Sequence, residues 1–129
     1  MDGRGEGAQL EVQLSTDALG SRLSALGSKR YDEYVTRTTH AVLDADGMTD
    51  KSLRWAVFHR RMEEIPDNLR AYVEKVRQHA YKVTDEDVEA LKRAGYSEDA
   101  IFELTGAAAL GAAIHRLERG LIALNASKA

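Results

Sequence analysis

Four histidines are the only side chains of this 129-residue chain whose ordinary pKa lies near neutral pH. His115 follows an uncharged stretch, residues 104–114, at the point where the last helix should leave the core. Glu118 stands three residues further on, and Tyr72 or Tyr81 could lie nearby. This pattern fits a pocket in which His115 and Glu118 perform acid–base chemistry. A structural histidine at the core margin, hydrogen-bonded to a backbone carbonyl, is the simpler interpretation of the same pattern.

Metal ligation is the second chemistry to consider. His59 and Glu63 lie four residues apart, and His115 and Glu118 lie three apart. Carboxylate-bridged di-metal bundles use the reverse order, Glu-x-x-His, on two helices. Ordinary surface pairs explain both spacings. The Asp44–Gly47 segment resembles the start of a calcium loop, but Trp55 occupies the twelfth position, where a glutamate is needed. The sequence therefore predicts no metal and no cofactor.

Composition excludes further classes. The chain has no cysteine, so disulfides, thiol redox chemistry and thiolate metal sites are excluded. The net charge of −3 gives no attraction to nucleic acid. The turn within residues 87–105 resembles a helix-turn-helix, yet both helices open with acids that would repel phosphate. The longest uncharged stretch falls well short of the ~20 residues that span a bilayer. The start is polar and glycine-rich, with no signal-peptide pattern, so we expect a cytoplasmic protein without membrane or nucleic-acid partners.

The organisation that must position these residues is all-α. Apolar residues recur at three- and four-residue steps, the only proline is Pro66, and no strand pattern is evident. We expect residues 1–12 to be a disordered tail and residues 13–129 to form a single-domain bundle of about six helices. The predicted ranges are 18–26, 29–45, 51–64, 68–81, 85–94 and 98–124.

The last two helices have the clearest boundaries. Thr84 is a good N-cap with acids behind it, Gly95 is a typical C-terminal stop, and Ser97 caps the next helix. Every residue of 106–113 except Leu110 is glycine or alanine, which predicts close helix packing. The partner could be another helix of the same chain or a second copy across a symmetry axis.

Charge is segregated along the chain. Residues 51–82 carry an excess of basic side chains, and residues 84–103 carry an excess of acidic ones. Two faces that complement each other within the fold are the simpler interpretation. A head-to-tail interface between copies is the alternative.

The segment from Val88 to Ile101 reads V-E-A-L-K-R-A-G-Y-S-E-D-A-I, and an alanine-rich helix follows it. This pattern resembles the alkylhydroperoxidase D-like (AhpD-like) and carboxymuconolactone decarboxylase-like superfamily of small all-helical proteins. The resemblance covers roughly the last third of the chain, and residues 68–83 more loosely. It implies an AhpD-like helical bundle that assembles as a homo-oligomer, namely a dimer, trimer or hexamer.

The resemblance also indicates where chemistry is missing. Redox members carry a Cys-x-x-Cys-x-x-x-His motif, whose positions fall at about Ala80, Val83 and Asp87. Decarboxylase-type members have a histidine where this chain has Gly106 or Ala107. We therefore expect a non-redox accessory or ligand-binding protein, with a protein partner or a small apolar ligand.

The ligand pocket implied by the resemblance lies near His79, Tyr81, Asp87 and Tyr72, although these residues also fit an ordinary helix end. The alternative function is a cofactor-free decarboxylase or lyase that uses His115 as its acid–base group.

Overall fold

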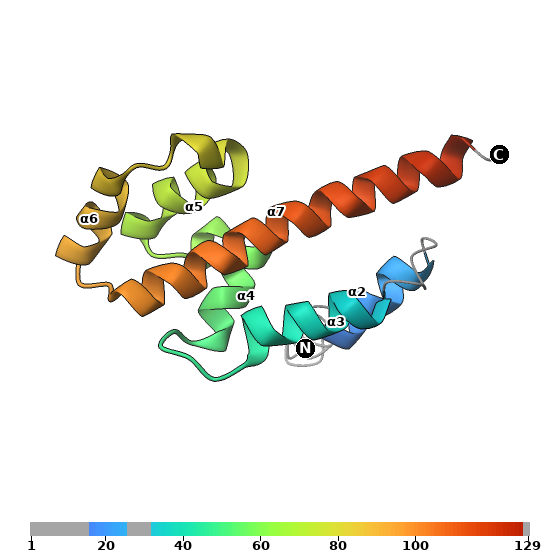
Figure 1. Cartoon of the computed structure of the whole chain (residues 1–129), viewed down its shortest axis with the longest axis horizontal. Helices are drawn as coiled ribbons and strands as arrows, with labels where there is room; N and C mark the ends of the chain where they lie inside the picture. The colour runs from blue at the N-terminus through green and yellow to red at the C-terminus, as the bar shows by residue number, and fades with distance from the viewer. Residues whose placement is uncertain (1–15, 26–31, 128–129) are drawn as a thin grey trace, which may run out of the picture. The chain divides into compact units, whose positions relative to one another are not determined.

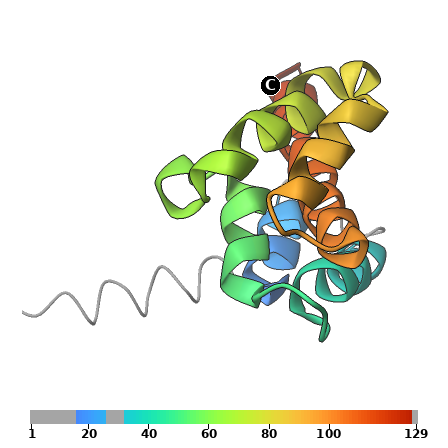
Figure 2. The same ribbon diagram turned by 90° about the vertical axis from the view of Figure 1, so that its left-hand side faces the viewer.

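The computed structural model describes residues 16–25 and 32–127, and these contain six α-helices and no strand (Figures 1 and 2). The all-α prediction is thus confirmed for the described residues. The predicted tail, residues 1–12, lies outside them. The helices are α2 (Thr16–Leu23), α3 (Asp32–Thr39), α4 (Lys51–His59), α5 (Asp67–His79), α6 (Asp85–Arg93) and α7 (Glu98–Ser127).

The chain divides into two compact units. One comprises Met1–Ala41 and Leu117–Ala129, in which α2 packs against α3 and the Arg22 guanidinium pairs with the Glu118 carboxylate. The other, Val42–Arg116, contains α4, α5, α6 and the first part of α7. That residues 13–129 form one AhpD-like bundle stays a prediction.

The core of the unit Val42–Arg116 is built from the apolar stripes of its helices. Figures 1 and 2 show α4, α5 and α6 gathered around the first part of α7. Each fully buried side chain of this size contributes about 1.5–3 kcal/mol relative to its exposed state. The most deeply buried members are Val57, Ile65, Leu69, Val73 and Leu104.

Several helices end earlier than predicted. The helix expected over 51–64 stops at His59, because Arg60 adopts a left-handed conformation with φ of 58°. The Arg60 and Arg61 amides donate to carbonyls of the last turn, and a 3₁₀ turn, Met62–Glu64, follows. Neither a glycine nor an asparagine stands at this helix end, so the residue types do not indicate that α4 stops at His59. The Glu74 carboxylate holds the Arg60 side chain through two hydrogen bonds of 2.5 and 2.7 Å.

Two other helices change geometry near their ends. The element predicted over 29–45 is described as α3 followed by a π-helical turn, His40–Asp44. The element predicted over 68–81 is α5 followed by a 3₁₀ turn, Ala80–Lys82. These changes leave the order of the helices as expected.

The turn between α6 and α7 and the start of each helix are confirmed, whereas α7 runs to Ser127, beyond the predicted end at residue 124. Thr84 forms a capping box, in which its hydroxyl accepts from the Asp87 amide (3.3 Å) and its own amide donates to the Asp87 carboxylate (2.9 Å). Gly95 has a φ of +105°, which an L side chain rarely adopts, and therefore ends α6. The Ser97 hydroxyl accepts from the Ala100 amide at 3.1 Å.

The small-residue segment of α7 packs within the chain along one side. Ala107, Ala108 and Ala112 are buried, whereas Ala109 and Ala113 are exposed. At Gly111 the α7 backbone comes close to the end of α4 and to Arg77 of α5.

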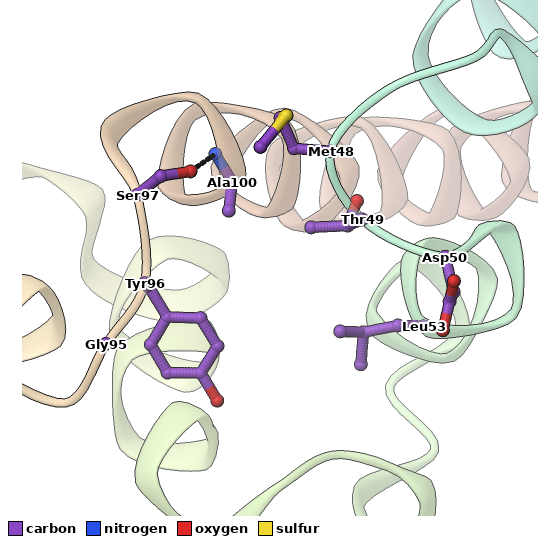
Figure 3. Close-up of a pocket in the computed structure, with 8 residues that line it drawn as sticks. All are labelled: Met48, Thr49, Asp50, Leu53, Gly95, Tyr96, Ser97 and Ala100. Atoms are coloured by element: carbon purple, nitrogen blue, oxygen red, sulfur yellow. Dashed lines mark hydrogen bonds between the residues drawn. The ribbon is translucent and has the colours of Figure 1, made fainter.

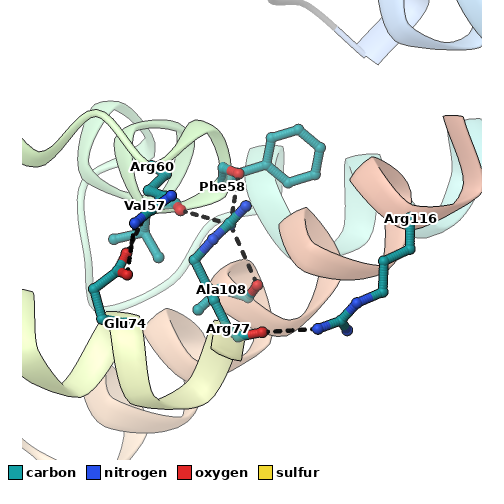
Figure 4. A network of polar contacts seen from close by, with 7 residues as sticks. All are labelled: Val57, Phe58, Arg60, Glu74, Arg77, Ala108 and Arg116. Carbon is teal, nitrogen blue, oxygen red and sulfur yellow. Dashed lines mark hydrogen bonds and ion pairs between the residues drawn. The ribbon is translucent and has the colours of Figure 1, made fainter. Parts of the chain in front are cut away.

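Arg77 joins three helices at this approach (Figure 4). Its Nη1 donates to the carbonyls of Phe58 (2.9 Å), Val57 (3.3 Å) and Ala108 (3.5 Å). Arg116 in turn donates to the Arg77 carbonyl at 3.0 Å. Burial, and then the nearby charge of Arg60, lowers the pKa of the Arg77 guanidinium below its ordinary value. Arginine nevertheless stays protonated, so a half-buried cation is held here mainly by backbone oxygens.

The opposite charges of the two segments meet within the unit Val42–Arg116. Lys75 of α5 bonds both carboxylate oxygens of Asp87 on α6, at 2.9 and 3.0 Å. This contact supports the interpretation that the basic and acidic segments complement each other inside the fold. In the described part of the chain, no helix has the length and hydrophobicity that a membrane crossing requires.

Candidate ligand-binding cavity

A cavity of about 390 Å³ opens in the unit Val42–Arg116 (Figure 3). Its volume falls within the range of small-molecule sites, about 300–1,000 Å³. Two segments far apart in the sequence supply the walls, and Figure 3 shows Leu53 and the Tyr96 ring facing each other across the space. The lining residues are Met48, Thr49, Asp50, Leu53, Gly95, Tyr96, Ser97 and Ala100.

The turn from α6 to α7 builds one wall. The positive φ of Gly95 lets the chain reverse tightly, and the Tyr96 amide then donates to the Leu91 carbonyl at 3.1 Å. The Tyr96 hydroxyl donates to Asn68 Oδ1 on α5 at 2.7 Å, which fixes the direction of the ring. Ser97 is occupied as the cap of α7. This wall is therefore set by local capping chemistry.

The loop that enters α4 builds the opposite wall, and Glu103 of α7 holds it. The Glu103 carboxylate accepts from the amides of Met48 (2.8 Å) and Thr49 (2.9 Å) and from the Thr49 hydroxyl (2.7 Å). Gly47 leaves room for this carboxylate, since a Cβ there would lie 2.7 Å from Glu103 Oε1.

Arg54 also holds this loop in place. Only 3% of Arg54 is exposed, and its guanidinium donates to the carbonyls of Val42 (3.2 Å) and Thr49 (3.3 Å). Its Nε has no hydrogen-bond partner among the described residues. The loop is thus fixed by one carboxylate and one guanidinium, both acting largely on main-chain atoms.

The Glu103 anchor should make stability depend on pH. Burial by itself would raise the pKa of Glu103, but the hydrogen bonds from Met48 and Thr49 bring it below its ordinary value. A carboxyl group with a lower pKa in the folded chain stabilises the fold above its unfolded pKa, about 4.3. That stabilisation is lost as pH falls through the folded pKa.

We expect Glu103→Gln to lower the free energy of unfolding by about 1 kcal/mol at neutral pH, because a neutral oxygen is a weaker acceptor. Urea unfolding at a series of pH values should show this deficit shrinking as the wild-type carboxylate protonates. Glu86→Gln removes the same charge from an exposed side chain and serves as the control. A deficit that is constant with pH, or equal in both variants, would contradict the anchoring role.

The chemistry available in the cavity favours binding. Asp50 is the only lining side chain with a full charge, and neither a thiol nor a histidine is in the lining. Asp50 stands at the N-cap position of α4 without a side-chain capping bond. An apolar space with a single carboxylate has the composition of a recognition site.

The residues predicted for acid–base chemistry lie elsewhere. The His115 side chain is exposed on α7, whereas the neighbouring Ile114 is buried. The Glu118 carboxylate pairs with Arg22. The structure therefore places His115 in solvent and gives Glu118 a cationic partner of its own.

The residues predicted for a ligand pocket also do not line the cavity. Tyr72 is buried, and its hydroxyl shares a 2.7 Å hydrogen bond with Thr105. Asp87 is engaged by Lys75 and by the capping box. His79 and Tyr81 do come together, with ring centroids 6.0 Å apart, but Tyr81 is 81% exposed. The structure thus brings together only His79 and Tyr81 of this group.

Within residues 16–25 and 32–127, no three histidine, aspartate or glutamate side chains are grouped so as to hold a metal ion. In comparisons with known proteins, the chain matches no family model, no curated protein and no solved structure.

Proposed function

We propose that this chain is a non-redox AhpD-like, carboxymuconolactone decarboxylase-like protein that acts in the cytoplasm as an oligomeric accessory or ligand-binding protein. The observation that carries the proposal is the position of the cavity. Gly95, Tyr96 and Ser97 belong to the segment that resembles this superfamily, and the same three residues line the cavity. The resemblance and this cavity thus meet at one turn.

The composition of the site supports binding without redox work. The chain has no cysteine, and its cavity is bounded mainly by a tyrosine ring, a leucine, a methionine and an alanine. Such a lining retains a small molecule by burying apolar surface, at about 25 cal/mol per Å².

Exposed apolar side chains support assembly. Phe102 on α7 is 79% exposed, and Met48 beside the cavity is 65% exposed. Aromatic side chains and methionine are enriched in protein–protein interfaces, so these two residues offer contact area to a partner. A second copy of this chain is the partner that the family resemblance implies.

Native mass spectrometry of the full chain, purified without chelator, tests this function. We expect a dimer, trimer or hexamer and an added mass that matches a small organic molecule. Phe102→Ser should shift the population towards monomer, whereas Arg93→Ser, on the exposed end of α6, should not. A bare monomer at micromolar concentration would overturn the proposal.

The alternative proposal is a cofactor-free decarboxylase or lyase with His115 as acid–base group. It requires the imidazole in a closed site beside a second titratable group. The exposure of His115 and the pairing of Glu118 with Arg22 do not favour it.

A further inference from the structure

The cavity has an unusual balance of charge for a site beside two helix starts. The starts of α4 and α7 both contribute lining residues, and the positive end of a helix dipole ordinarily favours anions. Here Asp50 precedes α4, and Glu98 and Asp99 occupy the first turn of α7. These carboxylates already neutralise the positive ends of the two helices, so a further anion would be repelled.

Asp50 is available to a ligand. No hydrogen bond or ion pair joins its carboxylate to another side chain in the described part of the chain, and α4 takes no side-chain cap from it. Asp50 lies in the lining next to Leu53, on the wall opposite Tyr96 (Figure 3). A group that occupies the cavity would therefore meet a carboxylate at one end and an aromatic ring across from it.

No cation in the lining competes for Asp50. The guanidinium of Arg54, four residues further along α4, is buried and donates to the Val42 and Thr49 carbonyls. Its charge acts on Glu103, which is itself bound to the loop. The Glu103 carboxylate is therefore already bound to groups of the protein, whereas the Asp50 carboxylate is not.

We propose that the cavity binds a small organic ammonium ion with an aromatic or branched apolar body, of the arylalkylamine type. The ammonium group pairs with Asp50, and the apolar body lies between Leu53 and the Tyr96 ring. This inference names the ligand class for the proposed ligand-binding function and rests on it.

Three matched probes test the charge preference: 2-phenylethylammonium, 3-phenylpropionate and 2-phenylethanol, which share a phenylethyl body. Each is titrated into the ¹⁵N-labelled full chain and followed by amide chemical shifts. We expect saturable shifts for the ammonium probe at residues 48–53 and 95–100, with an affinity up to about fivefold above those of the other two. Fivefold corresponds to about 1 kcal/mol, the upper end of the range for an ion pair at an exposed carboxylate such as Asp50.

Two isosteric variants localise the effect. Asp50→Asn keeps a good N-cap residue for α4 and removes only the charge, so binding of the ammonium probe should weaken about fivefold. Asp46→Asn removes the same charge from an exposed carboxylate of the same loop that is outside the lining, and should leave binding unchanged. Far-UV circular dichroism checks that both variants fold.

Each other outcome overturns the proposal. Tighter binding of 3-phenylpropionate at the same amides would mean that the helix starts select an anion. Equal binding of 2-phenylethanol would mean an apolar site without charge preference. Absence of saturable shifts for the ammonium probe would mean that the cavity does not take this class. An oligomer with a retained molecule would leave the proposed function standing in all three cases, so the two failures are distinguishable.

Discussion

Gly111→Ala should lower the free energy of unfolding by about 3 kcal/mol or more, the largest effect of any single methyl group added to α7. A Cβ at this position would lie 2.2 Å from the Phe58 carbonyl oxygen and 2.4 Å from Arg77 Nη1. The carbonyl belongs to the last turn of α4 and cannot move without shifting that helix. The variant must therefore separate α7 from α4 or distort one of them.

Gly120→Ala is the matched control on the same helix. Nothing lies within 4 Å of a Cβ there, so alanine should add about 0.5–1 kcal/mol through its higher helix propensity. Denaturant unfolding of both variants measures the difference. If Gly111→Ala does not fold, Gly106→Ala supplies a further comparison, since its Cβ would meet only Val42 Cγ1 at 3.8 Å. Equal stabilities of the variants at 111 and 120 would contradict the close approach.

Arg77→Met should lower the free energy of unfolding by about 2–3 kcal/mol. Methionine keeps the length of the apolar stem but removes the Arg77 donor to the Phe58 carbonyl, and an acceptor left without a partner costs about 1–3 kcal/mol. The Val57 carbonyl still accepts from the Arg60 amide. Arg93→Met, at the exposed end of α6, should cost only a few tenths of a kcal/mol. Chemical denaturation of both variants is the measurement, and equal losses would exclude a structural role for Arg77.

The two changes should also interact. In the Arg77→Met background, Gly111→Ala no longer meets Nη1, but the Phe58 oxygen remains in its path. The penalty should therefore become smaller and persist, and a double-mutant cycle measures the coupling. A penalty that vanishes would mean that the guanidinium alone, and not the helix backbone, limits the approach.

The parts of the fold that sequence could predict are those governed by neighbours along the chain. The Thr84 cap, the Gly95 stop and the Ser97 cap depend on residues within a few positions, and all three are confirmed. The stop at Arg60 was missed because no glycine marks it. Its Glu74 partner lies on another helix, and this distant contact holds its side chain.

The cavity was beyond sequence reasoning for the same reason. Its walls lie more than forty residues apart, and the Glu103 carboxylate that holds one of them is 54 residues from Thr49. The useful signal was indirect: Arg54 sits among the apolar residues of α4, where a buried cation requires oxygen partners. The prediction of an acid–base role for His115 was based on the apolar stretch before it. Since α7 continues as a helix to Ser127, that side chain falls on an exposed position.

The anchoring of the cavity loop has a consequence for how this protein can evolve. Glu103 and Arg54 bind the loop chiefly through its main-chain atoms. Glu103 accepts from the Met48 and Thr49 amides. Arg54 donates to the Val42 and Thr49 carbonyls. The side chain of Met48 contributes to the lining but to neither anchor. Substitution at this position therefore alters the shape of the site while the loop keeps its path. Under the proposed ligand-binding function, the preference for a ligand can change among descendants of this sequence while the loop that lines the cavity keeps its structure.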